Sequence, residues 1–215
     1  MTVAPPPTEL IALVADTNIE FALRGLLSRP PALGIRRVDF RVFVHPEHDP
    51  GCLRKAAPFL RPQAARFRRA LVVFDRDGCG KEHQPRTELE AEVERGLAGA
   101  GWDDRAAVVV IDPELENWVW SDSPEVDRVL GWAELRMPVR DWTRSQGFTW
   151  SQGKPARPKE ALQAALRHAR KPRSSALFEA LAQRVGLDRC HDPAFGKLRA
   201  CLQRWFPAGE ARPAP

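Results

Sequence analysis

Four short apolar runs, each followed by a segment that can form a helix, constrain the fold of this 215-residue chain more than any other feature. The runs lie at residues 9–15, 38–44, 69–74 and 106–111. Their lengths suit buried strands, and residues 17–27 and 85–98 between them carry apolar side chains at helical spacing. Strands that alternate with helices predict an α/β fold in which helices flank a four-stranded parallel sheet.

The chain changes character after the fourth run. A short helix is expected at residues 121–132, and residues 136–158 are irregular and rich in Trp, Gly and Pro. Three more helices are predicted, at residues 159–170, 174–185 and 193–206. We therefore expect an α/β domain over residues 8–132, a helical, basic extension over residues 133–206, and flexible tails at residues 1–7 and 207–215.

Composition narrows the class of protein. No apolar run approaches the ~20 residues that span a bilayer, and the first residues lack the features of a secretory signal. We therefore expect a cytoplasmic protein that makes no contact with membranes. The four cysteines form no C-x-x-C pair, which argues against a zinc site and a disulfide framework and favours reduced thiols.

Basic charge is concentrated in the last third of the chain. Residues 154–215 hold 13 basic and five acidic residues, whereas residues 1–153 hold 20 basic and 23 acidic ones. Such a segment is typical of proteins that bind nucleic acid, DNA or RNA. A chain this rich in arginine can, however, carry the same basic excess for compositional reasons alone. The residues expected to contact nucleic acid are Lys81, Lys154, Lys159, Arg167, Arg170, Lys171 and Arg173.

Acidic residues follow three of the predicted strands. Asp75 and Asp77 come after the third, at a spacing that points both side chains the same way in an extended chain. Asp16 closes the first strand, and Glu114 and Glu116 follow the fourth. Parallel strands bring their carboxyl ends to one edge, where such a cluster favours one or two Mg²⁺ or Mn²⁺ ions and phosphoryl transfer. The plainer interpretation is a turn in which aspartates cap the next helix.

These motifs resemble the TOPRIM family, which includes topoisomerases, primases and the nuclease domains of OLD-family proteins. Asp75-Arg76-Asp77 matches the Asp-x-Asp that follows the third strand of that family. The segment from Asp112 to Asp122 is similar to a Pro-x-x-Glu-x-Trp-x-x-x-Asp stretch of small prokaryotic TOPRIM-like proteins associated with anti-phage defence. In that alignment Glu116 is the metal-site glutamate and Glu114 its neighbour. Asp192-Pro193-Ala194-Phe195 resembles a Ser-Pro-Ser-Phe segment, so the likeness extends from Leu10 to about Leu202.

The resemblance implies a TOPRIM-like Rossmannoid sheet and a hydrolase, a metal-dependent nuclease or nucleic-acid-processing subunit. It also implies other subunits of a defence system as partners, with a homodimer as one allowed state. The first motif of the family reads Val-Glu-Gly, whereas this chain has Val14-Ala15-Asp16. The catalytic role would then fall to Asp16 or to Glu20 in the first helical turn. If neither fills it, the protein would be an inactive binding or scaffold subunit.

Two other motifs leave alternatives open. The stretch Phe74-Asp75-Arg76-Asp77-Gly78 resembles the nucleophile motif of haloacid-dehalogenase-like phosphatases, but that motif normally closes the first strand, and here two strands precede it. The loop from His45 to Asp49 holds residue types that suit a metal. Because consecutive ligands rarely converge on one ion, we expect His45 or His48 to contact substrate phosphate instead.

Overall fold

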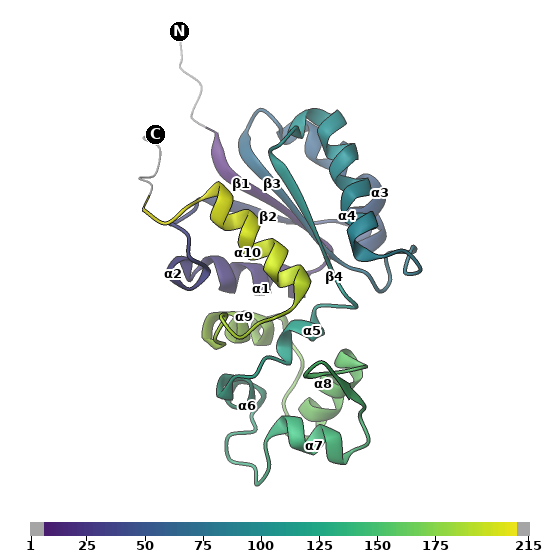
Figure 1. Cartoon of the computed structure of the whole chain (residues 1–215), viewed down its shortest axis with the longest axis vertical. Coiled ribbons are helices and arrows are strands. Elements are labelled where there is room, and N and C mark those ends of the chain that lie inside the picture. Colours follow the sequence, from purple (N-terminus) through teal and green to yellow (C-terminus); the bar gives the residue numbers. More distant parts are fainter. Residues whose placement is uncertain (1–6, 210–215) are drawn as a thin grey trace.

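A four-stranded parallel sheet forms the centre of the computed structural model, which describes residues 7–209 (Figure 1). The strands are β1 (Thr8–Val14), β2 (Phe40–Val44), β3 (Phe67–Asp75) and β4 (Ala106–Ile111), in the order β2-β1-β3-β4. All three strand pairs are parallel, with Val14 opposite Val44 and Val73, and Asp75 opposite Ile111. The predicted α/β fold with a parallel sheet flanked by helices is therefore confirmed.

Burial explains why the central strands are continuously apolar. Helices cover both faces of the sheet, and they bury two runs of residues completely. These are residues 10–15, which comprise most of β1 and the residue after it, and residues 70–74 of β3. The edge strand β2 instead alternates, and its Phe43 is 41% exposed. The burial of each strand thus follows the helices that cover it, since the other edge strand, β4, packs against α4 (Arg86–Leu97) and α10 (Pro193–Trp205) and is buried from Ala107 to Ile111.

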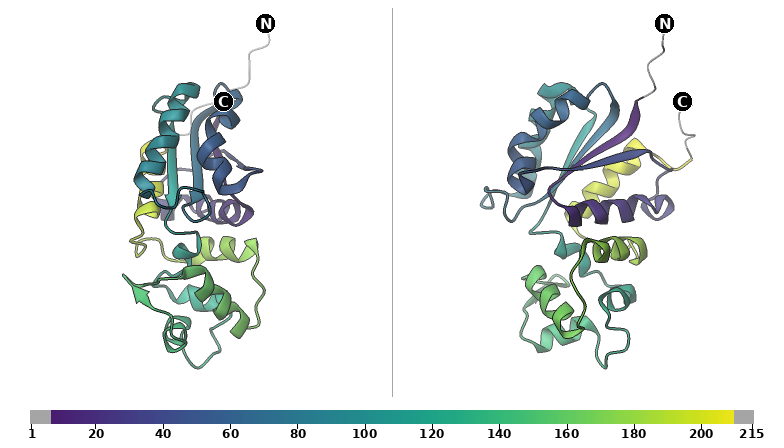
Figure 2. Two further views of the ribbon diagram at one scale, coloured as in Figure 1. Left: turned by 90° about the vertical axis from the view of Figure 1, so that its right-hand side faces the viewer. Right: turned by 180° about the vertical axis from the view of Figure 1, so that it is seen from behind.

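Two layers of helices enclose the sheet (Figures 1 and 2). One face is covered by α3 (His48–Leu60) and α4 (Arg86–Leu97), and the other by α1 (Thr17–Leu27) and α10 (Pro193–Trp205). Short turns complete these layers: α2 (Pro30–Leu33), η1 (Arg61–Gln63) and η2 (Ala98–Trp102). The sequence favours a shorter helical segment between Cys52 and Phe67. Helix α3 instead begins four residues earlier, at His48, because a proline such as Pro50 is tolerated in the first turn of a helix.

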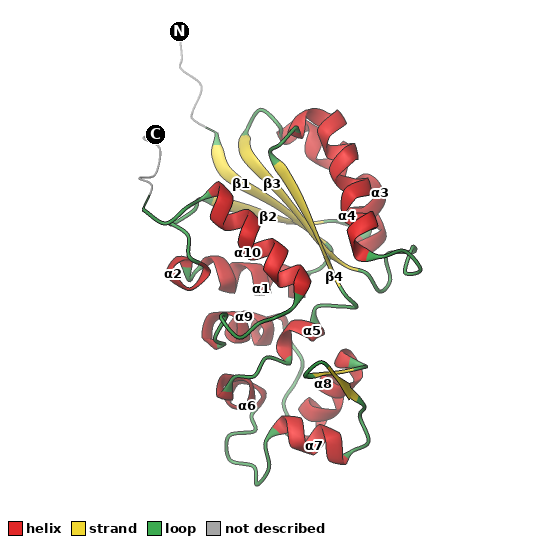
Figure 3. Cartoon of the chain, viewed as in Figure 1, coloured by secondary structure: helices red, strands yellow, loops and turns green. Residues whose placement is uncertain are grey.

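A second, mostly helical lobe lies beyond the carboxyl ends of the strands (Figure 3). It contains α5 (Glu116–Val119), α6 (Pro124–Leu130), α7 (Val139–Ser145), a hairpin of β5 (Trp150–Ser151) and β6 (Lys154–Pro155), and α8 (Pro158–His168). The chain then returns: α9 (Ser175–Arg184) packs along α1, and α10 packs on β4. The helices of the last third are therefore divided between the two lobes.

The prediction that residues 136–158 are irregular was wrong at α7. This helix has only seven residues, too few to show a helical period in the sequence. Its Trp142 ring lies 5.0 Å from the ring of Trp132 and 4.6 Å from that of His168. Tertiary packing of this kind, rather than local propensity, stabilises so short a helix.

The ends of the chain and the cysteines complete the description. Residues 1–6 and 210–215 of the predicted tails lie outside the described residues, whereas Pro207 forms an antiparallel bridge with Ile35. All four cysteines are free thiols, and Cys52, Cys79 and Cys201 are buried. Between residues 7 and 209, no helix has the length and hydrophobicity needed to cross a membrane.

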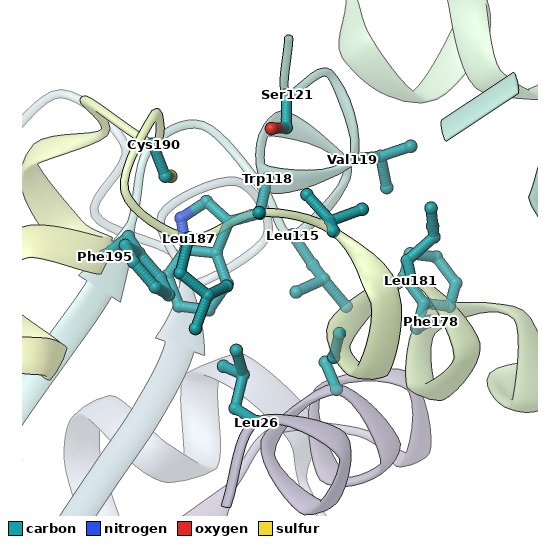
Figure 4. A pocket seen from close by; sticks show the side chains of 14 residues that line it. Leu26, Leu115, Trp118, Val119, Ser121, Phe178, Leu181, Leu187, Cys190 and Phe195 are labelled. Atoms are coloured by element: carbon teal, nitrogen blue, oxygen red, sulfur yellow. The ribbon is translucent and has the colours of Figure 1, made fainter. Parts of the chain in front are cut away.

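A small apolar cavity lies where the returning helices α9 and α10 meet α1 and the α5 segment (Figure 4). It has a volume of about 50 Å³ and lies among Leu26 of α1, Leu115, Phe178 of α9 and Phe195 of α10. Small-molecule sites usually enclose roughly 300–1,000 Å³, so this cavity is a packing gap and not a ligand pocket. The candidate functional site of the protein is therefore sought outside this cavity.

Candidate functional site

The carboxyl edge of the sheet gathers acidic residues from separate elements. Asp75 is the last residue of β3, and Glu116 is the first residue of α5, which follows β4. Asp16 is the N-cap of α1, where its Oδ1 accepts a hydrogen bond from the Ile19 backbone at 2.8 Å. Because the strands are parallel and in register, these three residues share one edge, as the sequence predicted.

Asp75 is the centre of this cluster. Its Oδ1 is buried and has no hydrogen-bond partner between residues 7 and 209. Burial raises the pKa of this carboxyl well above its usual value, and the charges of Asp49, Glu116 and Asp16 raise it further, against an opposing backbone hydrogen bond from Leu115. Asp75 as a whole is partly buried, and a carboxylate with one buried oxygen among like charges is an arrangement that a cation relieves.

Asp49 is the member of the cluster that sequence reasoning did not assign to the site. It lies in the first turn of α3, and its Oδ1 accepts a hydrogen bond from the Asp75 backbone at 2.8 Å. Burial raises the pKa of Asp49, and the charge of Asp16 adds to the shift. The loop from His45 to Asp49 was recognised, but the predicted helix began after it. Only the earlier start of α3 brings Asp49 against β3.

The two histidines of that loop have different environments. His45 is buried, its Nδ1 accepts a hydrogen bond from the Glu47 backbone at 3.0 Å, and burial lowers its pKa. His48 is exposed, donates from Nδ1 to the Ala15 carbonyl oxygen at 3.1 Å, and has a φ of 51°. His45 therefore supports the loop, and His48 is the histidine at the surface of this edge.

Glu114 and Glu116 are held by cations from the C-terminal segment. Glu116 is 2% exposed and forms an ion pair with Arg173, and Glu114 is 5% exposed and accepts from the backbone and the Nζ of Lys159, both at 3.0 Å. Burial alone would lower the pKa of Lys159, but the hydrogen bond to Glu114 and the charges of Glu114, Glu116 and Asp75 raise it. Two of the predicted metal ligands are thus neutralised by basic side chains.

Asp77 and Glu20 stand apart from Asp75. Strand β3 ends at Asp75, so the alternation that predicts a shared direction for both aspartates does not extend to Asp77, which is exposed in the following turn. The Asp77 backbone donates to the Pro113 carbonyl oxygen at 2.9 Å. Glu20 forms an ion pair with Arg24 along α1 at 2.8 Å. Neither carboxylate is a main source of the pKa shift of Asp75.

Most of the residues predicted to contact nucleic acid have partners inside the protein. Lys81 pairs with Glu92 at 2.7 Å, Lys154 pairs with Asp192 at 2.9 Å, and Lys171 donates to the Val129 carbonyl oxygen. Lys159 and Arg173 pair with the glutamates described above. Within the part of the chain that the structure describes, only Arg167 and Arg170 of this set make no side-chain hydrogen bond or ion pair.

Asp192 fixes α5 relative to α10. This buried carboxylate accepts hydrogen bonds from Asn117 Nδ2 at 2.8 Å, from Trp118 Nε1 at 3.0 Å and from two backbone amides at the start of α10. Burial opposes its ionisation, but the charge and hydrogen bond of Lys154 lower its pKa. Asp192 thereby holds the segment that carries Glu116, and it uses the indole of Trp118 as a structural donor.

The oxygen donors at this edge suit a hard divalent cation. In residues 7–209 no three acidic, histidine or cysteine side chains are placed closely enough to hold a metal ion as they stand. Mg²⁺, however, usually keeps several waters and binds through one or two carboxylates together with substrate phosphate. The unpartnered Asp75 Oδ1, beside Asp49 and Asp16, fits that mode of binding.

Comparisons with known proteins identify no relative. No family model matches the chain, and no curated protein or solved structure matches it.

Proposed function

We propose that Asp75, with Asp16 and Asp49, binds Mg²⁺ or Mn²⁺, and that the protein is a TOPRIM-type phosphodiesterase that acts on nucleic acid. The observation that carries this proposal is the buried, unpartnered Oδ1 of Asp75 among like charges. Leaving such a group unpaired costs roughly 1–3 kcal/mol, which a bound cation would offset. The resemblance to defence-associated proteins adds partner subunits of a defence system to the proposal.

When bound, the cation would polarise the phosphodiester and lower the pKa of a coordinated water. The residues of the chain hold this arrangement in place. The hydrogen bond from the Asp75 backbone to Asp49 ties β3 to α3, and the N-cap bond of Asp16 fixes that carboxylate at the end of β1. Lys159 and Arg173 neutralise Glu114 and Glu116, which reduces the negative charge that an incoming phosphate would meet.

The test is cleavage of labelled DNA and RNA in the presence of Mn²⁺ or Mg²⁺, with a chelator as the blank. We expect Asp75→Asn to abolish cleavage and Asp49→Asn to reduce it by about 10–100-fold, because Asp49 orients Asp75. Asp188→Asn is the matched control, since Asp188 is 88% exposed and pairs only with Arg199. Cleavage retained by Asp75→Asn would contradict the mechanism.

A second candidate is an inactive scaffold subunit. The ion pairs of Glu114 and Glu116 with Lys159 and Arg173 favour it, because they already satisfy two carboxylates that catalysis would use. Such a protein would bind Mn²⁺ in calorimetry, lose that binding in Asp75→Asn, and cleave no nucleic acid. Hydrolysis of a small phosphomonoester would instead point to the phosphatase interpretation.

A further inference from the structure

A groove at the opposite end of the sheet, where the strands begin, is lined by arginines. Its volume is about 480 Å³, and its polar and aromatic lining consists of Arg36, Phe67, Arg68, Arg69, Arg105, Trp205 and Phe206. These residues come from the segment before β2, from the first residues of β3, from the residue before β4 and from the end of α10. Among residues 7–209 no acidic side chain lines the groove, although Glu9 pairs with Arg36. We refer to it as the arginine groove.

The arginine groove presents several hydrogen-bond donors. The indole of Trp205 is 7% exposed, and its Nε1 is buried without a hydrogen-bond partner in the described range. The Nε of Arg36 is in the same state. Arg68 is exposed and makes no hydrogen bond or ion pair with residues 7–209. A site with several donors and no acidic side chain selects an anion.

Three of the guanidinium groups are held in position. Arg36 pairs with Glu9 at 2.6 Å and lies 5.2 Å from the Phe206 ring. Arg69 donates to the Asp104 carbonyl oxygen at 3.0 Å and lies 5.7 Å from the Trp205 ring. Arg105 donates to the Phe67 carbonyl oxygen at 3.1 Å. Fixed, planar guanidinium groups match the oxygens of a phosphate.

The cations of this region also repel one another. Burial lowers the pKa of Arg69, and the charges of Arg204 and Arg105 lower it further. Carbonyl oxygens accept hydrogen bonds from Arg69 and Arg105 but carry no full negative charge, and Arg69 keeps further N–H groups for a ligand. A bound anion would remove this repulsion.

We propose that the arginine groove binds the phosphate groups of a nucleotide or of a nucleic-acid chain, with Arg68 and Arg69 as donors and the Trp205 ring in the wall of the groove. The proposal is independent of the acidic edge, because the two sites lie at opposite ends of the strands. It assigns the nucleic-acid contact of this protein to arginines outside the basic C-terminal segment.

The test uses the full chain in a chelator, so that no metal-dependent step contributes. The probes are inorganic phosphate, a 5′-mononucleotide and a labelled single-stranded oligonucleotide, measured at several salt concentrations. The double variant Arg68→Gln/Arg69→Gln should weaken binding at least about tenfold and reduce the salt dependence by about one to two phosphate contacts. The control Arg128→Gln/Arg144→Gln removes the same charge from two exposed arginines that pair with Glu125 and Asp141.

A local measurement makes the result specific. The indole N–H signal of Trp205, assigned by its loss in Trp205→Phe, should shift when phosphate is added. Tighter binding of the oligonucleotide than of the mononucleotide would identify a backbone site, and equal binding would identify a site for one terminal phosphate. The proposal is overturned if the groove variant binds every probe as tightly as the control variant. Because Arg68 makes no contact that folding needs, Arg68→Gln alone repeats the test if the double variant is unstable.

Discussion

Asp75 shows how one residue of a proposed cation site can lower the stability of the folded protein. A carboxyl group at the end of a buried run has no local reason to be there, since residues 70–74 before it are all apolar and buried. Because burial and three neighbouring carboxylates raise its pKa, the folded state holds the proton more tightly than the unfolded state does. The neutral form is therefore favoured by folding, and stability falls as pH rises from the unfolded pKa, near ~3.9, towards the raised folded value.

The replacement Asp75→Asn should make the metal-free protein more stable at pH 8, by roughly 1 kcal/mol or more, because the amide stays neutral at every pH. The gain should shrink towards pH 4, where Asp75 is protonated in the folded state and about half protonated in the unfolded state. Urea denaturation in a chelator at the two pH values measures it. Asp188→Asn should change stability little at either pH, and an unchanged or lower stability of Asp75→Asn at pH 8 would refute this account of the site.

At the scale of elements, the close packing of α1 and α9 connects the C-terminal segment to the sheet. A Cβ at Gly25 would lie 2.7 Å from the Glu179 carbonyl oxygen and 2.8 Å from the Ala182 Cβ. Gly25 is therefore required for a close approach of the two helices, although glycine weakens a helix interior. The same packing positions the segment that delivers Arg173 to Glu116.

Gly25→Ala should destabilise the protein by about 1–3 kcal/mol, since the new methyl group meets backbone and cannot be accommodated by a side-chain movement. Gly96→Ala is the matched control in α4, where the added Cβ would lie 3.6 Å from the Ala57 Cβ, an ordinary contact. That control should be neutral or stabilising by up to about 1 kcal/mol. Denaturation midpoints compare the two, and similar values for both variants would show that the helices can separate without loss.

At the scale of the whole molecule, the net charge of +5 includes the contributions of two regions of opposite charge at opposite ends of the sheet. Acidic residues gather at the carboxyl edge of the sheet, and arginines gather where the strands begin. Three basic residues of the C-terminal segment, Lys154, Lys159 and Arg173, serve as counterions of buried acidic side chains, and two of them do so at the acidic edge. Overall charge thus says little about which surface meets a polyanion.

Cation binding should appear as a pH-dependent gain in thermal stability of the whole protein. Burial raises the pKa values of Asp75, Asp49 and Glu114, so their charged forms are disfavoured until a cation binds. Mn²⁺ at about a hundredfold above its Kd adds ~2.7 kcal/mol, which corresponds to roughly 5–10 °C in Tm. Differential scanning fluorimetry should show this shift at pH 8 and a much smaller one near pH 4. An equal shift at both pH values, or one that persists in Asp75→Asn, would exclude the cluster as the binding site.

The sequence by itself determined the layers of the fold and the edge that carries the acids. Strand positions follow from continuous apolar runs in β1, β3 and β4, and a parallel arrangement necessarily brings Asp16, Asp75 and Glu116 to one edge. These inferences succeed because period and hydrophobicity act over a few neighbouring residues. The short helix α7 was missed for the same reason, since its stability comes from contacts distant in the chain.

Only the tertiary structure decided which charges meet. The hydrogen bond from the Asp75 backbone to Asp49, the pairing of Arg173 with Glu116 and the arginine groove each join segments that lie far apart in the sequence. No local pattern encodes such pairs, because a charged side chain finds its partner through the path of the helices that return to the sheet. The physical reason is that burial and charge neutralisation depend on where the whole chain places a group, whereas strand formation depends mainly on its neighbours.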